Sequence, residues 1–444
     1  MAKSLYPPGA TNANWFSVFN AVSFQITLGS PMILYAKSLG ATATVLGVIA
    51  ALTPLLTIAQ IPAARFLVNT GYRKFIFRGW GSRTLVVFVI AAVPLFTFLN
   101  NVSKIALLLF CLFIFNLLRG FSSGAWLPWI TDLIPENVRG RFLSRDQTFQ
   151  NLGGLFSLLL CAAILRGHAL PWQFSLIFLV SALGGAVSLL FLLRIPDIEA
   201  RETLVKSNMR VPWKEIVTFP PFLRLVIFTL LWVFTVGAVG VFSVAFLKSK
   251  IGFSESSILV LTALFFLGAI AALPITGRLI DRTGSKAVLQ ADMALVLVYH
   301  VFWWLIAARV FTPPFWIFGA LSFFNGIAGA NFGLAHTRLT MNTMPPMGRT
   351  HFFAFFTVIT SVGLGVSPVI WGMVIDGIGE REWWIHALSW NRYSIFYGAV
   401  VTLLLIVFAY SFALHEQRGT KERVDRRDTV FRNTLRQLLR LWQR

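Results

Sequence analysis

The sequence predicts an all-α membrane protein in which twelve transmembrane helices form two pseudo-symmetric six-helix bundles. Three observations support this fold class: an apolar composition, apolar runs of membrane-spanning length, and motifs that recur in the second half of the chain. Apolar residues make up 57% of the chain and charged residues only 12%, whereas about a quarter of a soluble domain is charged. The mean hydropathy of +0.74 likewise places the chain in a bilayer.

Twelve apolar runs are long enough to cross a membrane, because a helix of about 20 apolar residues spans the hydrocarbon core. A polar or charged stretch separates each run from the next. The predicted spans are 13–37, 43–69, 75–98, 103–133, 142–166, 173–194, 222–247, 255–280, 286–309, 314–343, 351–377 and 393–414.

The charges of the connections predict the orientation of the chain. The net charge is +21, and most Lys and Arg residues lie in alternate connections and in the C-terminal segment. Basic residues favour the cytoplasmic side of a membrane. We therefore expect a plasma-membrane protein (the inner membrane of a bacterium) with both termini in the cytoplasm. Because the basic residues serve this orientation, we expect no nucleic-acid partner.

A short motif recurs 210 positions along the chain, after the fourth and after the tenth span. Its Pro, Arg and Phe appear first as Pro135, Arg139 and Phe142 and again as Pro345, Arg349 and Phe352. Internal symmetry in an apolar chain is typical of secondary transporters. The sequence therefore predicts two copies of a unit of six helices.

The repeat and the longest inner connection divide the chain. We predict an N-terminal bundle over 1–194, a cytoplasmic linker over 195–221, a C-terminal bundle over 222–415 and a basic tail over 416–444. Apolar residues recur at helical spacing among the arginines of the tail. Such a helix favours the anionic inner leaflet, although a regulatory or partner-binding helix is the alternative.

A second repeated loop carries a family resemblance. Residues 277–286 read Gly-x-Leu-x-Asp-Arg-x-Gly-x-Lys, which resembles the cytoplasmic loop motif between the second and third helices of each half in the major facilitator superfamily. The first-half copy, 64–73, keeps the glycine as Gly71 but has Val68 in place of Asp281. The resemblance implies that fold, and a carrier working by alternating access.

The resemblance also implies a cytoplasmic gate. In the family, this loop latches the cytoplasmic side in one state, and Asp281, Arg282 and Lys286 would hold that role here. An Asp at a helix end makes charge-assisted bonds to neighbouring helix ends. The alternative is that these charges only orient the protein. The other repeated motif predicts a companion cluster of Asp132, Arg139 and Arg349.

Arg119 is the most informative candidate for the substrate site. It precedes Asp132 by 13 positions, or about 20 Å along a helix, which places it near the centre of the bilayer. A charge there must face protein or water and find a partner. Arg119 resembles the Arg of a second family motif on the fourth helix. It could contact an anionic substrate, couple protons, or bond structurally within the bundle.

The other candidates follow from the resemblance, which implies that helices one, four, seven and ten line the cavity while three, six, nine and twelve face lipid. On span one, Asn20 and Thr27 share a face, and Gln25 lies roughly opposite. The remaining candidates are Ser123, Trp126, Trp232, Asn325 and His336. A lone His is more often structural, and Asn side chains often bond between helices.

We expect a secondary transporter for a small solute, neutral or anionic because no carboxylate lies at mid-depth of the four cavity helices. Two alternatives remain open: an efflux carrier for drugs or lipophilic compounds, and a transporter-like receptor or scaffold that moves no solute. We expect no enzymatic activity, because the six histidines are scattered over both faces.

We also expect no cofactor and no metal. Cys111 and Cys161 lie inside apolar runs, where cysteine acts as a small apolar residue. The expected partners are the solute and the lipid bilayer, and we expect a monomer.

Overall fold

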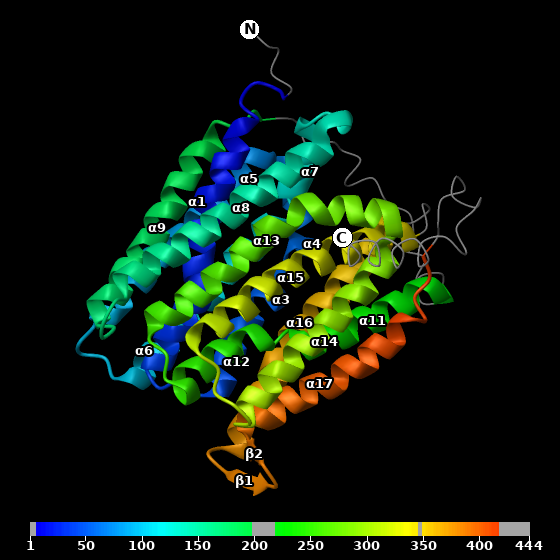
Figure 1. The fold of residues 1–444 in the computed structure, drawn as a ribbon. Helices are drawn as coiled ribbons and strands as arrows, with labels where there is room; N and C mark the ends of the chain where they lie inside the picture. The colour runs from blue at the N-terminus through cyan, green and yellow to red at the C-terminus, as the bar shows by residue number, and fades with distance from the viewer. Residues whose placement is uncertain (1–5, 198–217, 345–348, 417–444) are drawn as a thin grey trace, which may run out of the picture.

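The computed structural model describes residues 6–197, 218–344 and 349–416. Most of the predicted linker, and the predicted tail apart from Glu416, lie outside these residues. Helices run between two faces of the molecule (Figure 1). We call the face next to both ends of the described chain the terminal face, and the one that carries the β-hairpin the hairpin face.

The first half is helical throughout its spans. Its elements are α1 (Thr11–Leu28), α2 (Ser30–Ser38), α3 (Ala43–Thr57), α4 (Gln60–Thr70), α5 (Tyr72–Ala92), the 3₁₀ turn η1 (Val93–Leu95), α6 (Asn101–Ser123), α7 (Trp126–Leu133), α8 (Glu136–Ile164) and α9 (Pro171–Leu193).

The second half repeats this order and adds a hairpin before its last helix. Its elements are α11 (Pro220–Val236), α12 (Val239–Phe246), the π-helical turn η3 (Leu247–Ile251), α13 (Glu255–Thr283), α14 (Ser285–Ala307), α15 (Phe315–Thr343), α16 (Arg349–Ile378), the antiparallel strands β1 (Glu382–Ile385) and β2 (Leu388–Asn391), and α17 (Arg392–Ser411).

The prediction of twelve spans is confirmed. The described residues contain 12 helical spans long and apolar enough to cross a membrane. Four spans are broken by short non-helical steps: between α1 and α2 at Gly29, between α3 and α4, between α6 and α7, and between α11 and α12. Such discontinuous helices free backbone groups at membrane depth and are typical of transporter binding sites.

The two repeated motifs occupy equivalent places. Gly71 and Gly284 both adopt positive φ, 76° and 90°, and each lies at the start of the third span of its half. Only glycine takes this conformation readily, which explains why it is kept in both loops.

The phenylalanines of the other motif also match. Phe142 and Phe352 are both buried. Phe142 contacts Tyr6 before the first span, and Phe352 contacts Phe219 and Phe222 at the start of the seventh. Pro345 lies outside the described residues, as does the side chain of Arg349.

The halves meet most closely where α3 crosses α16. A Cβ on Gly47 would lie 2.1 Å from the Pro368 carbonyl oxygen, and one on Gly372 would lie 2.6 Å from the Ala43 carbonyl oxygen. The two backbones therefore touch, as small residues allow in membrane helix pairs. Beside them, α8 packs against α13, where Gly154 faces the ring of Phe266.

Asp376 closes this contact at the hairpin face. Its carboxylate accepts hydrogen bonds from the backbone N–H of Ala43 (2.9 Å) and from the N–H and hydroxyl of Thr44 (both 2.7 Å). A carboxylate at the start of α3 is favoured by the unpaired N–H groups and the helix dipole. Two further bonds join the halves on this side, between Ser30 and Thr262 and from Ser256 to the Ala162 carbonyl.

The apolar core, like the contact at Asp376, joins the two halves near the hairpin face. The largest cluster draws on both halves, with Ile33 and Leu46 packed in one core with Phe242 and Trp371. The clusters nearer the terminal face are formed within a single half: one around Trp129 in the first, and others in the second. The halves thus share a core near the hairpin face and have separate cores near the terminal face.

We predict that Asp376→Ala loosens the hairpin face. Hydrogen bonds to a charged group are worth about 1.5–3 kcal/mol, so their loss should shift the closed state by about tenfold or more. The measurement is labelling by a membrane-impermeant maleimide of a cysteine at Ser30, which lines a cavity behind this contact. We expect faster labelling in vesicles that expose the hairpin face, in a background without Cys111 and Cys161.

Glu380→Gln is the matched control. Glu380 is an acid on the same face, but its partners Lys250 and Arg392 both belong to the second half. The hydrogen bond from Lys250 holds the pKa of the Glu380 carboxyl below its usual range. Equal labelling of both variants and of the parent would contradict a role for Asp376 in closing this face.

Candidate functional site

Two adjoining cavities lie inside the helical bundle. The larger, which we call the central cavity, has a volume of about 600 Å³. The smaller, the N-terminal cavity, has about 370 Å³. Gln25 and Phe266 line both. The two cavities therefore form one site to which both halves contribute.

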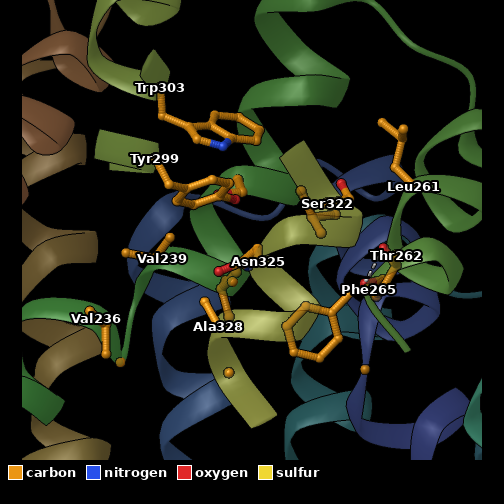
Figure 2. Close-up of a pocket in the computed structure, with 18 of the residues that line it drawn as sticks. Val236, Val239, Leu261, Thr262, Phe265, Tyr299, Trp303, Ser322, Asn325 and Ala328 are labelled. Carbon is orange, nitrogen blue, oxygen red and sulfur yellow. Dashed lines mark hydrogen bonds between the residues drawn. The ribbon is translucent and has the colours of Figure 1, made fainter. Parts of the chain in front are cut away.

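The central cavity is mostly apolar and aromatic. Figure 2 shows Tyr299 and Trp303 of α14 on one wall, Thr262 and Phe265 of α13 on the other, and Asn325 of α15 between them. Trp232 also lines this cavity. The predicted candidates Trp232 and Asn325 thus face the same space.

The step between α1 and α2 places Gln25 at the junction of the cavities. Gly29 leaves the helical conformation with ψ −158°, and a Cβ there would lie 2.6 Å from the Gln25 side-chain nitrogen. The Gln25 amide therefore lies against the backbone of Gly29. Only glycine leaves room for this contact.

Of the predicted candidates on α1, Asn20 and Gln25 line the N-terminal cavity, whereas Thr27 lines neither cavity. Thr27 is fully buried and bonds to the Ser181 hydroxyl of α9 at 2.7 Å, as Ser23 does at 3.4 Å, and it lines neither cavity. Small hydroxyl residues allow α1 and α9 to pack closely and bond to each other. The residues of α1 that line the N-terminal cavity are Phe16, Ser17, Asn20, Ala21, Phe24 and Gln25.

His336 lies behind the cavity wall. Its ring stacks on Phe332 (centroids 5.4 Å apart), which in turn stacks on Trp232 (3.8 Å), and its Nε2 bonds to the Thr229 hydroxyl at 2.8 Å. Trp232 and Phe332 line the central cavity, but His336 does not. This placement favours the structural interpretation of His336.

Arg119 lies in the last two turns of α6, before the step between α6 and α7, and lines the N-terminal cavity. Its guanidinium lies 4.9 Å from the centroid of the Phe24 ring and donates to the Thr57 hydroxyl at 3.5 Å. Ser123 and Trp126 line the same cavity. Trp126 packs against Phe16, with centroids 4.7 Å apart.

A second buried arginine, Arg83 of α5, was missed by the sequence analysis. It lines the N-terminal cavity, is only 4% exposed, and donates a hydrogen bond to the Asn20 side-chain oxygen. The resemblance assigned the third helix to lipid. The depth argument that identified Arg119 could have found Arg83 too, because Arg83 also lies within an apolar run.

Among the described residues that line the N-terminal cavity, there is no Asp or Glu to balance these arginines. Its other polar lining residues are neutral: Ser17, Asn20, Gln25, Ser123, Gln147, Gln150 and Asn151. A buried acid, Asp146 of α8, accepts a hydrogen bond at 2.9 Å from the amide of Gln150, which lines the cavity, and another at 3.4 Å from Asn14. The cavity thus presents two cationic groups among neutral donors and acceptors.

Asp281, Asp132 and Arg139 each make a contact within their own half. Asp281 pairs with Arg338 of α15, and Asp132 accepts from the Tyr72 hydroxyl at 3.2 Å. Arg139 donates to the Ile134 carbonyl at 3.4 Å. Arg282 lies in the last turn of α13. A contact of this gate across the halves stays a prediction.

Lys286 belongs to a connection that the sequence analysis did not foresee. Its ammonium donates to the Phe412 and Leu414 carbonyls after α17, and Glu416 accepts from the backbone N–H groups of Ser285 and Lys286. The first half has a counterpart, because Asp197 pairs with Arg73 at the start of α5. In each half, an acidic residue that follows the sixth span thus caps the start of the third span.

Metal binding is not supported by the described side chains. Among residues 6–197, 218–344 and 349–416, no group of three or more His, Cys, Asp or Glu residues is placed to hold an ion.

Comparisons with known proteins agree with this architecture. The model of the Major Facilitator Superfamily matches residues 15–254 and again 234–443. A citrate-proton symporter from Salmonella typhi is 25% identical over 289 residues, which cover 61% of this chain and 65% of the symporter. The match therefore spans less than two thirds of that relative's length.

Solved transporter structures share the fold. The D-xylose-proton symporter superimposes with a TM-score of 0.67 at 13% identity, over 90% of this chain and 96% of that one. A bacterial homologue of the human lysosomal transporter Spinster, in an inward-facing conformation, gives 0.66 at 14% identity over 93% and 98%. The nucleoside transporter NupG gives 0.64 at 11% identity over 93% and 100%.

The two matched repeats, the twelve spans and the shared fold lead to one conclusion: the chain belongs to the Major Facilitator Superfamily and is an integral membrane protein.

Proposed function

We propose that this protein is a secondary transporter that moves a small solute by alternating access. The observation that carries the proposal is the pair of joined cavities, lined from both halves inside the bundle. A site between two halves that rock against each other can be exposed to each side of the membrane in turn. A citrate-proton symporter is similar to this chain in sequence and a D-xylose-proton symporter is similar in fold, which supports this assignment.

The charge of the site favours an anionic solute over a neutral one. Arg83 and Arg119 face the N-terminal cavity, and no carboxylate lines it. Buried cationic groups without an acidic partner are costly and favour a negative ligand. The citrate-proton symporter among the relatives is named for an anionic solute, which agrees with this preference.

A lipophilic solute is the second candidate, and the central cavity supports it. Trp232, Phe265, Tyr299, Trp303 and Phe332 give that cavity an aromatic lining. Apolar pockets with few polar groups are suited to drug-like compounds. A receptor or scaffold that moves no solute would have the same cavities, so flux decides between it and a carrier.

We further propose a monomer of the plasma membrane, with the terminal face in the cytoplasm. The basic residues at the starts of α5 and α14 support this orientation under the positive-inside rule: they are Arg73, Lys74, Arg78 and Lys286. In this orientation, the shared core closes the outer side, and the site would exchange solute with the cytoplasm.

The first prediction concerns binding and flux. We expect a thermal-shift screen over dicarboxylates, phosphate esters, sugars, nucleosides and lipophilic cations to identify a solute that raises the melting temperature by a few degrees, because a ligand that binds only the folded protein stabilises it. The same solute should drive counterflow in proteoliposomes. Stabilisation by a solute that shows no counterflow would favour the receptor.

The second prediction concerns the gate. Asp281→Asn should raise maleimide labelling of a cysteine at Ser123 from the terminal face, because a latch needs the charge of Asp281 when that face closes. Arg338→Gln is the control, since it removes the ion pair that Asp281 makes within its own half and keeps the charge of Asp281. Equal effects of the two variants would show that Asp281 acts only through Arg338, and not as a latch.

A further inference from the structure

We propose that Arg83 is a substrate-recognition residue, and that Arg83 and Arg119 together select a compact solute with two negative charges. The solute class is a small dicarboxylate or a phosphate monoester. The inference rests on the proposed transport function and narrows its substrate. It begins from the fact that both guanidinium groups line one cavity of about 370 Å³.

Neither arginine has an acidic partner among the described residues. The hydrogen bonds of Arg83 and Arg119 go to Asn20 and Thr57, which are neutral. The buried acid Asp146 bonds to Asn14 and Gln150 instead. Two positive charges in one cavity repel each other, and a dianion would remove this repulsion by pairing with both.

The guanidinium groups retain donors for a ligand. Each Arg carries five N–H donors in a planar fork, and one hydrogen bond is made by each group here. This fork binds carboxylate or phosphate oxygens in a bidentate manner. Both oxyanions fit this chemistry, and the size of the cavity favours a compact one.

The surroundings hold both side chains in place. Arg83 lies over the Trp80 and Phe115 rings, at 4.8 and 5.5 Å from their centroids, and Arg119 lies over Phe24 at 4.9 Å. Asn20 orients Arg83 and acts as a positioning residue. The neutral amides of Gln147 and Asn151 line the same space and could bond to hydroxyl or carbonyl groups of the solute.

The test compares matched probes that differ in charge. Succinate, its monoamide and its diamide carry two, one and no negative charges, and glycerol 3-phosphate is compared with glycerol at pH 7.5. Binding to the full chain in nanodiscs is measured by titration calorimetry. We expect one dianion, succinate or glycerol 3-phosphate, to bind at least tenfold more tightly than its less charged analogues, and the arm that binds identifies the oxyanion.

Variants then assign the effect to Arg83. Arg83→Gln should weaken dianion binding by about tenfold to a hundredfold, as expected for lost charge-assisted hydrogen bonds, while binding of the monoanion changes little. Arg83→Lys should restore part of the loss. Arg78→Gln is the matched control, because Arg78 lies on the same helix but is exposed and lines neither cavity.

Asn20→Asp separates recognition from misfolding. A carboxylate at this position would neutralise Arg83 from within, so we expect a higher melting temperature without ligand and a loss of dianion binding. A misfolded protein would instead show a lower melting temperature together with the loss of dianion binding. The proposal is wrong if neither dianion binds better than its analogues, or if Arg83→Gln leaves the affinity unchanged.

The two proposals can fail separately. Counterflow of a neutral solute that Arg83→Gln does not affect would overturn the dianion inference and leave the transporter intact. Tight dianion binding without counterflow would support the site and contradict transport.

Discussion

The halves of this molecule are held together where the backbones of α3 and α16 touch without intervening side chains. Gly47 and Gly372 permit the contact, and Asp376 places a carboxylate on the free N–H groups at the start of α3. A charge-assisted cap of this kind is strong enough to hold a helix end. It is also released when the helices separate, because water can then bond to the same groups.

The position of this contact determines what the rest of the bundle can do. Because the clamp and the shared core lie toward the hairpin face, the terminal ends of the halves pack on their own clusters. The cavities lie between these regions, with an aromatic wall from the second half and two arginines from the first. The repeat thus supplies matched frameworks, and the chemistry of the site is divided between them.

Residues whose role follows from local backbone or from membrane depth could be predicted from the sequence. The roles of Gly71 and Gly284 could be predicted from the tight turns of their loops. The place of Arg119 in the bundle could be predicted because it is a charge inside an apolar run. The faces of helices could not be predicted in the same way. Thr27 bonds to Ser181 of α9 and not to the cavity, because α9 packs on that side of α1. The third helix was expected to face lipid, although Arg83 of α5 lines the N-terminal cavity.

Rocking of the halves is tested most directly by two distances, measured by electron spin resonance, in a variant that forces α3 away from α16. Spin labels at Ser38 and Arg381 report on the hairpin face, and labels at Lys74 and Asn342 report on the terminal face. In Gly47→Val, we expect a longer distance between the labels at the hairpin face and a shorter distance between those at the terminal face. Gly377→Val is the control, because a Cβ at Gly377 meets no neighbour, and both distances should stay as in the parent. A hairpin face that opens while the terminal face stays as it was would contradict rocking of the halves about the central site.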